Sequence, residues 1–76
     1  MINELDIVVL VHNIEEYGLQ EGDIGAVVHV YKHDAAYEVE FVTGEGETIA
    51  VLTLTSDDVR IMGEREILHV RELAVA

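Results

Sequence analysis

The sequence predicts an all-β fold, a small five-stranded barrel or strongly bent antiparallel sheet that is followed by a C-terminal extended tail. Two observations lead to this prediction. Five short apolar segments recur about every ten residues, and glycines or acidic residues separate them, as turns separate short strands. Five strands are also too few for an immunoglobulin-type sandwich. The chain has 76 residues, which leaves room for one domain, residues 1–76.

The first two expected strands are residues 5–11 (LDIVVLV) and 25–31 (GAVVHVY), because both segments are short and rich in β-branched residues. The polar residues 12–20 between them predict a loop with room for one helical turn. Residues 21–23 (EGD) are typical of a turn, and Gly22 and Gly25 supply the backbone freedom that a sharp entry into a strand requires.

The third expected strand, residues 37–42 (YEVEFV), alternates regularly. Because successive side chains of a strand point to opposite faces, Tyr37, Val39 and Phe41 share one face, and Glu38, Glu40 and Val42 share the other. Residues 43–47 (TGEGE) predict a hairpin turn that leads into a fourth strand, residues 48–54 (TIAVLTL).

A tight or 3₁₀ turn at residues 55–58 (TSDD) then precedes a short fifth strand at residues 59–62. The expected interior side chains come from all five strands. They are Val8, Leu10, Val27, Val39, Phe41, Val51 and Val59.

The tail, residues 65–73 (REILHVREL), fits two patterns. Ile67, Val70 and Ala74 have helical spacing, whereas Leu68 and Val70 alternate with polar neighbours as in a strand. The pattern leaves both open, and we expect an extended strand.

The chain is strongly acidic, with 16 acidic residues against 4 basic ones and a formal net charge of −12. Such a surface repels phosphate backbones and anionic membranes, so we expect no nucleic acid and no membrane as partners. Two explanations of the charge stay open: a coat that keeps the protein soluble, and a surface complementary to a basic protein partner. No secretory signal and no stretch of the ~20 apolar residues of a membrane helix is visible, which predicts a cytoplasmic location.

The residues that carry chemistry form no recognisable motif. The chain has no cysteine, and His29 and His33, four positions apart, would meet only on a helix. Glu38 and Glu40 share one face of a strand, but so small a chain is not expected to enclose a substrate. The single serine, Ser56, has no histidine near it in the sequence. We therefore expect no enzyme, no metal site and no cofactor.

Residues 17–31 (YGLQEGDIGAVVHVY) resemble the core of a bacterial family catalogued as domain of unknown function 4926. Residues 36–42 (AYEVEFV), 47–54 (ETIAVLTL) and 58–60 (DVR) fit the same family in order and at the expected spacing. Most of the specificity comes from Gly18, Gly22, Asp23, Gly25, Glu40 and Phe41. Family members commonly have proline at the two places that hold Glu15 and Ile61 here.

The resemblance implies an SH3-like fold, similar to the small barrels of translation factors and of nitrile hydratase β subunits. It implies no characterised activity. Genes of such short acidic proteins often lie beside a companion gene, which by analogy suggests a two-protein module of the toxin–antitoxin kind. A shared fold alone does not establish a function.

Runs of consecutive apolar residues, such as VVLV and IAVLTL, put apolar side chains on both faces of their strands. One small interior cannot hold them all, so the tail, a second subunit or a partner must cover some. We therefore expect a homodimer that docks through residues 48–54 or 67–73, because both segments lack proline.

The sequence is best interpreted as a small acidic, non-enzymatic protein-binding module, the antitoxin or inhibitor of a toxin–antitoxin-like pair. The alternative is a structural or assembly accessory subunit of a larger enzyme complex. The expected partner-binding residues are Glu38, Glu40, Ile67, Leu68, Val70 and Leu73.

Overall fold

Five antiparallel strands form one sheet in the computed structural model, which describes residues 2–32 and 35–73. The strands are β1 (Ile7–Leu10), β2 (Ile24–Val30), β3 (Tyr37–Val42), β4 (Thr48–Leu54) and β5 (Val59–Ile61). A 3₁₀ turn, η1 (Glu15–Tyr17), lies in the loop where a helical turn was expected. The five predicted strands are therefore confirmed, with bounds that differ by at most two residues from those expected.

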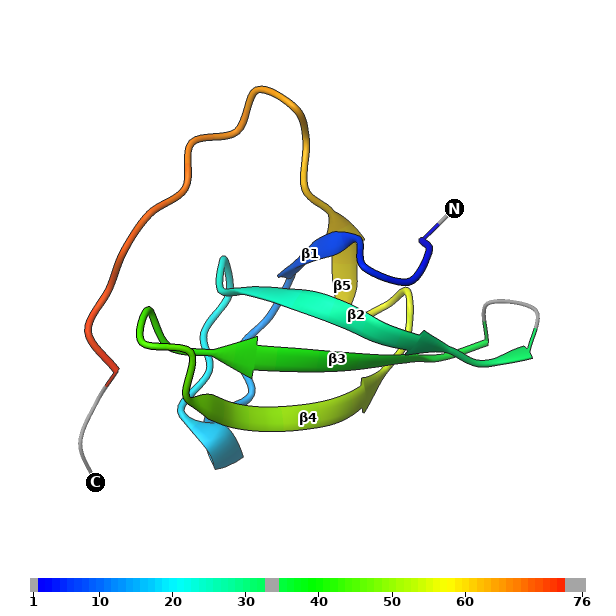
Figure 1. Ribbon diagram of the computed structural model, residues 1–76, viewed down its shortest axis with the longest axis horizontal. Coiled ribbons are helices and arrows are strands. Elements are labelled where there is room, and N and C mark those ends of the chain that lie inside the picture. The colour runs from blue at the N-terminus through cyan, green and yellow to red at the C-terminus, as the bar shows by residue number, and fades with distance from the viewer. Residues whose placement is uncertain (1, 33–34, 74–76) are drawn as a thin grey trace.

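The strand order is β4-β3-β2-β1-β5. Four consecutive strands form a meander, and β5 returns to pair with the free side of β1. The sheet is strongly bent: β5 runs across the direction of β2, β3 and β4 in Figure 1. The two edge strands, β4 and β5, do not pair within the described residues, so the sheet is open. Closure into an SH3-like barrel stays a prediction, as does a homodimer through the free edge of β4.

The hydrophobic core lies on the inner face of the bent sheet. Paired residues on neighbouring antiparallel strands share a face, so the pairs Val8–Gly25 and Val27–Val39 both point inward. The buried apolar cluster consists of Ile2, Val8, Leu10, Leu19, Val27, Tyr37, Val39, Phe41, Leu54 and Val59. Six of the seven predicted interior residues are in this cluster.

The seventh predicted interior residue, Val51, is wrong, because its side chain is 49% exposed. Val51 pairs with Glu40 on the outer face, whereas Leu52 pairs with the buried Val39. A register irregularity between Phe41 and Val42 determines which residues of β4 face inward and which face outward. The run IAVL carries no alternation of apolar and polar residues, so the sequence could not indicate which of its residues face inward.

Acidic side chains close four of the turns in the same way. In each turn a carboxylate oxygen accepts a hydrogen bond from the backbone N–H three residues earlier, as the acidic side chain does in a capping box. The four pairs are Asn3–Asp6, Gln20–Asp23, Thr55–Asp58 and Gly63–Glu66. Part of the acidity predicted to be a surface coat therefore has a local structural role.

The strand expected at residues 65–73 is wrong, because residues 62–73 contain neither a helix nor a paired strand. After β5 the chain turns away from the sheet and runs back along it, in orange and red in Figure 1, towards the loop that precedes β2. The prediction of a separate C-terminal tail is confirmed. The sequence pattern did not indicate that side-chain contacts, rather than the backbone hydrogen bonds of a paired strand, attach the tail to the rest of the protein.

The first prediction concerns Gly25 of β2, against which side chains of β3 pack. An ideal Cβ at Gly25 would lie 2.6 Å from Val39 Cγ1 and 2.9 Å from Phe41 Cε1. We expect Gly25→Ala to lower the free energy of unfolding by about 1–3 kcal/mol, the usual cost of overpacking. The matched control is Gly44→Ala, whose Cβ would meet nothing within 4 Å, and which should change stability by less than ~0.5 kcal/mol. Urea denaturation measures both, and equal effects would contradict the packing described here.

Candidate functional site

The outer face of β1 and β2 is apolar. In the strand register, Ile7 pairs with Ala26 and Val9 pairs with Ile24, and these four side chains point away from the core. Ile7 and Ile24 remain exposed at the surface. The outer face of this part of the sheet is therefore a second apolar surface, as the apolar excess of the sequence predicted.

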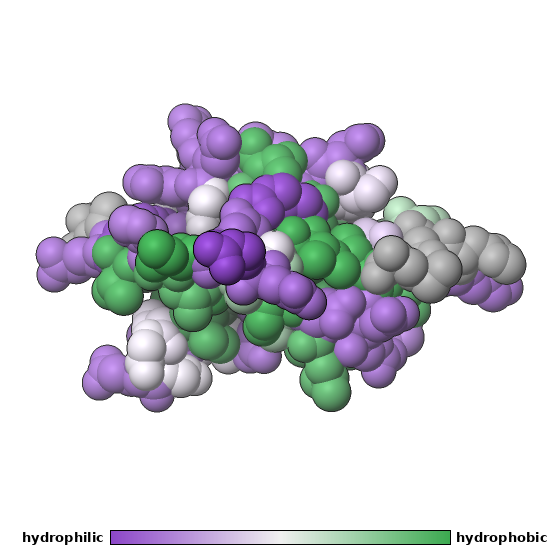
Figure 2. All heavy atoms as spheres, turned by 90° about the horizontal axis from the view of Figure 1, so that it is seen from above, coloured by the Kyte–Doolittle hydropathy of each residue, from purple (hydrophilic) through white to green (hydrophobic). Residues whose placement is uncertain are grey.

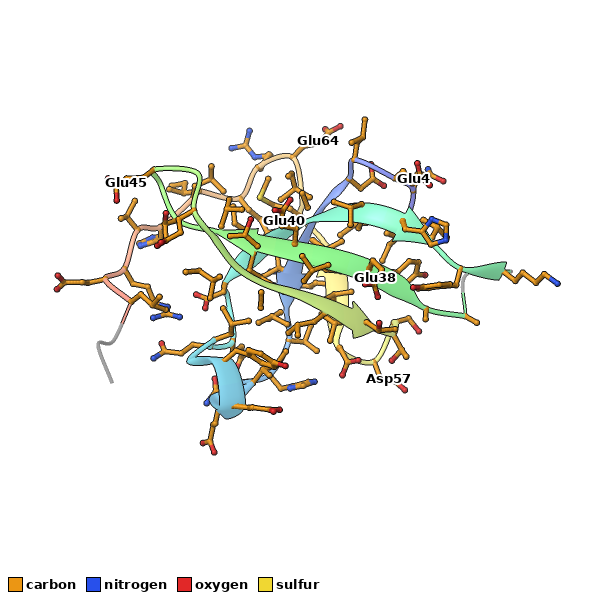
Figure 3. The ribbon with its side chains drawn as sticks, turned by 60° about the horizontal axis from the view of Figure 1, so that its bottom comes forward. Glu4, Glu38, Glu40, Glu45, Asp57 and Glu64 are labelled. Atoms are coloured by element: carbon orange, nitrogen blue, oxygen red, sulfur yellow. The ribbon has the colours of Figure 1, made fainter. Side chains whose placement is uncertain are left out.

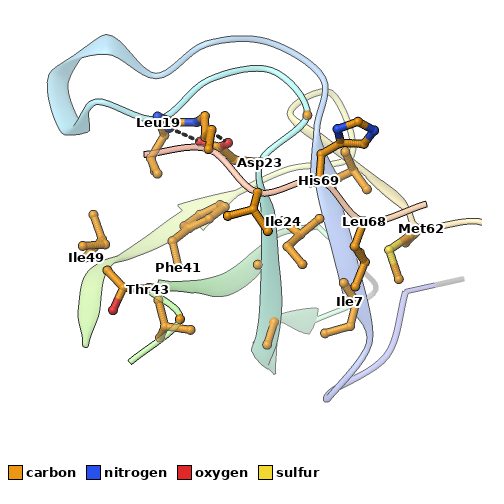
Figure 4. Close-up of a pocket in the computed structure, with 18 of the residues that line it drawn as sticks. Ile7, Leu19, Asp23, Ile24, Phe41, Thr43, Ile49, Met62, Leu68 and His69 are labelled. Atoms are coloured by element: carbon orange, nitrogen blue, oxygen red, sulfur yellow. Dashed lines mark hydrogen bonds and ion pairs between the residues drawn. The ribbon is translucent and has the colours of Figure 1, made fainter. Parts of the chain in front are cut away.

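An open pocket of about 830 Å³ lies between this outer face and the tail. Its floor is formed by Ile7 and Ile24, the core residue Phe41 also borders it, and Met62 and Leu68 line it from the C-terminal side (Figure 4). At the other end it reaches the loop before β2 and the turn between β3 and β4. The pocket thus joins segments from both ends of the chain.

The tail forms the outer wall of the pocket. Leu68 points towards Ile7 and Met62, and His69 points away from the sheet (Figure 4). Leu68 is nevertheless 59% exposed, and its neighbours Ile67 and Val70 are 84% and 98% exposed. The tail therefore covers the pocket only in part and presents apolar side chains to solvent.

Arg71 attaches the far end of the tail to the loop before β2. Its Nε donates to Asp23 Oδ1 at 2.8 Å, and its terminal Nη2 donates to Asp23 Oδ2 and to the carbonyl oxygen of Gly18 at 2.9 Å. Two parallel N–H···O bonds to one carboxylate are the strong, planar geometry of arginine. The ion pair is half-exposed on the arginine side and more enclosed on the aspartate side.

A second ion pair holds the near end of the tail. Arg60 of β5 donates to both carboxylate oxygens of Glu66 at 2.7 Å, and the N–H of Gly63 donates to the same carboxylate. These hydrogen bonds, from Arg60 first and then from Gly63, lower the pKa of Glu66 to about 2. The tail is thus anchored at residues 66 and 71, and the four residues between the anchors bridge the pocket.

Asp23 keeps its negative charge although burial opposes it. Burial raises the pKa of Asp23, but the hydrogen bonds from Arg71 and from the Gln20 N–H outweigh it, so that this pKa lies below its ordinary value. Because the folded-state pKa is lowered, the ion pair stabilises the protein above the ordinary pKa near 3.8 and is lost as the pH falls through the lowered value.

Five of the six predicted partner-binding residues border this one pocket: Glu40, Ile67, Leu68, Val70 and Leu73. Glu38 lies outside it, further along the outer face. As predicted, Glu38 and Glu40 face away from the core, and each accepts a hydrogen bond from a hydroxyl of β4, Thr53 and Thr48 respectively.

The residues that build the sheet side of the pocket were not among the predicted site residues. Ile7 and Ile24 were available as members of apolar runs, but only the register shows that they face outward together. Asp23 was predicted to be a turn residue, which it is, and its second role as the partner of Arg71 was missed. The sequence offered one indication of this ion pair. The chain has only 4 basic residues against 16 acidic ones, so each basic residue has several possible carboxylate partners.

The histidines show no shared site in the described part of the chain. His12 bonds to the Asn13 carbonyl and to Asp58 at 2.7 Å, and these two contacts raise the pKa of His12 above its ordinary value. His29 lies 3.8 Å from Glu4, and His33 lies outside the described residues. Among residues 2–32 and 35–73, no group of three or more histidine, aspartate or glutamate side chains is placed to hold a metal ion.

Acidic side chains surround the molecule rather than gathering at one place. Glu4, Glu38, Glu45, Asp57 and Glu64 project from different sides in Figure 3. In the view of Figure 2, apolar patches reach the surface between hydrophilic side chains. The pocket is therefore an apolar site within a negatively charged surrounding.

A family model described as Domain of unknown function (DUF4926) matches residues 4–61 of the chain. The match includes every strand and ends at Ile61, so the tail lies outside it. No curated protein and no solved structure matches the chain. In the described residues, no helix has the length and apolar character needed to cross a bilayer.

The second prediction concerns the electrostatics of the two anchors. Arg71→Ala removes the main hydrogen bonds to Asp23 and leaves the effect of burial, so we expect the pKa of Asp23 to rise towards or above its ordinary value. Arg60→Ala is the matched control: it should raise the pKa of Glu66 from about 2 and leave that of Asp23 unchanged. Carboxyl carbon NMR titration of each variant measures both values. A pKa of Asp23 that is insensitive to Arg71→Ala would refute the ion pair.

Proposed function

Since this chain belongs to the DUF4926 family, whose description assigns no activity, we propose its function from its geometry: it is a small protein-binding module that docks a segment of a basic partner protein in the pocket under its tail. The observation that carries the proposal is the pocket itself. Its floor is an apolar face of the sheet. The tail that covers it leaves apolar side chains of its own exposed to solvent. Apolar surface of this kind, surrounded by polar residues, marks interaction sites.

The charge supports a basic partner. The chain carries a net charge of −12, and two of its four basic residues, Arg60 and Arg71, are already paired with carboxylates. An approaching protein therefore meets an almost purely negative surface. Such a surface raises the association rate of a basic partner and disfavours acidic ones.

The walls of the pocket argue for binding rather than catalysis. Its interior-facing side chains are mainly aliphatic, and two of its carboxylates, Asp23 and Glu66, are held by arginines and by backbone N–H groups, while the third, Glu40, accepts a hydrogen bond from the Thr48 hydroxyl. A general acid or base instead needs a pKa near the working pH, and both of these carboxylates have lowered values. We therefore propose a non-enzymatic role.

The partner we propose is the product of a companion gene, and the role is inhibition, as in a toxin–antitoxin pair. The alternative role, assembly of a larger enzyme complex, would use the same pocket. The two differ in the partner expressed alone: a toxin partner arrests growth, whereas an enzyme subunit is harmless and insoluble or inactive.

The third prediction compares two residues of β2 that are equally exposed. Ile24 is 40% exposed and lines the pocket, whereas Val28 is 44% exposed and does not line it. In tagged full-length chains expressed in the native host, we expect Ile24→Glu to weaken binding of the co-purified partner about tenfold or more, which is ~1.4 kcal/mol. Val28→Glu should retain it.

Quantitative mass spectrometry of the co-purified proteins identifies the partner, and circular dichroism confirms that both variants fold. The proposal is wrong if no protein is lost selectively with Ile24→Glu, or if both substitutions release the partner equally. Growth of cells that express the identified partner alone then decides between inhibitor and accessory subunit.

A further inference from the structure

The tail lies in the pocket as a bound peptide would. Three of its side chains face the body of the protein: Leu68 over Ile7 and Met62 (Figure 4), Arg71 on Asp23, and Leu73, which is half-buried near Gly18. The residues between and before them, Val70 and Ile67, are 98% and 84% exposed. Leu68 and Arg71 are thus three positions apart, not two as in a strand that pairs with a sheet, and Leu73 follows Arg71 after two positions.

The tail is held by side chains only. Within the described residues, no backbone N–H or carbonyl of residues 67–73 pairs with the backbone of another segment. Its attachments are the Arg71 ion pair and the Arg60–Glu66 pair, both of which are partly exposed to solvent. A competing segment that carries its own arginine would remake the hydrogen bonds to Asp23, so it can displace the tail at small net cost.

The end of the pocket at Asp23 is built to receive a guanidinium group. Three acceptors converge there: both carboxylate oxygens of Asp23 and the carbonyl oxygen of Gly18. Asp23 is held in place independently of the tail, because its Oδ2 also accepts the Gln20 N–H at 2.8 Å. A planar fork of N–H donors satisfies all three acceptors, and a lysine ammonium cannot reproduce that geometry.

The tail is a poor occupant electrostatically. Its acidic residues Glu66 and Glu72, which are part of the net charge of −12, repel the other carboxylates of the chain. A segment of a basic protein with the same two contacts would replace that repulsion by attraction. These charges therefore favour an occupant that shares the Leu68 and Arg71 contacts and lacks the acidic neighbours.

We propose that the pocket is a recognition site for an extended segment with a large aliphatic side chain and, three residues later, an arginine, and that the tail occupies this site until a partner displaces it. This inference rests on the proposed function and specifies the chemistry of the partner. The aliphatic side chain takes the place of Leu68 above Ile7, and the arginine takes the place of Arg71 on Asp23.

The test uses the full-length chain and a synthetic peptide. The peptide carries residues 64–73 of this sequence with Glu66→Lys and Glu72→Lys, and its control carries Arg71→Lys in addition. The receiving protein is the ¹⁵N-labelled chain with Arg71→Glu, in which repulsion from Asp23 detaches the tail. Wild-type chain, with its tail in place, is titrated in parallel.

We expect saturable amide shifts at Gly18, Asp23 and Ile24 of the Arg71→Glu chain, with the Arg71→Lys peptide binding about tenfold more weakly. The wild-type chain should bind the first peptide more weakly than the Arg71→Glu chain, because its tail competes. If Arg71→Glu unfolds, full-length Leu68→Ser replaces it, since Leu68 is not part of the core cluster and its loss also loosens the tail.

Three results would overturn the inference: no shift at those residues up to about 2 mM peptide, equal binding of the arginine and lysine peptides, or equal binding by wild-type and tail-released chains. A doubled mass of the wild-type chain in light scattering that Arg71→Glu abolishes would also overturn it, because the occupant would then be the tail of a second copy. If the peptide fails while Ile24→Glu still releases the native partner, the proposed function stands and only this inference is wrong.

Discussion

At Gly25 of β2, the side chains of Val39 and Phe41 from β3 fill the space where a side chain would begin. Both of these residues are buried, and Val39 pairs directly with Val27 in the core. Because side chains alternate along a strand, the residues on either side of Gly25, Ile24 and Ala26, must face outward. The apolar floor of the pocket is therefore a consequence of how the core packs beneath it. A bulkier residue at position 25 would disturb both faces of the sheet together.

The acidity of the chain has more than one physical origin. Asp6, Asp23, Asp58 and Glu66 each accept a backbone N–H within a turn, and two of them also bind an arginine. These carboxylates are parts of the fold, and the lowered pKa values of Asp23, Asp58 and Glu66 reflect those hydrogen bonds. Carboxylates that project into solvent, such as Glu45 and Glu64 in Figure 3, create the long-range field. Recognition at Asp23 is thus local and geometric, whereas attraction of a basic protein is a property of the whole surface.

Arg71 and Asp23 lie 48 positions apart, and their contact gives the tail its place. The alternative attachment, a sixth strand on the sheet, would have satisfied the backbone of the tail and covered it with a hydrogen-bonded neighbour. Instead, the backbone of residues 67–73 stays unpaired with other backbone groups of the described chain, and Ile67 and Val70 face solvent. A segment that is attached by two side-chain anchors and buries little apolar area has low local stability. This is the property that a displaceable cover requires.

The sequence by itself determined the five strands, the inward face of β3 and the turn residues, because these depend on local alternation and on backbone preferences that single residues express. It also indicated that apolar residues exceed what one small core can hold. Tertiary structure alone decided where the excess lies. The inward phase of β4 depends on an irregularity in its pairing with β3, so Val51 was misplaced. The outward pairing of Ile7 with Ala26 depends on strand register, and the course of the tail depends on one long-range ion pair. Such features arise from contacts between distant residues, which no local pattern in the chain encodes.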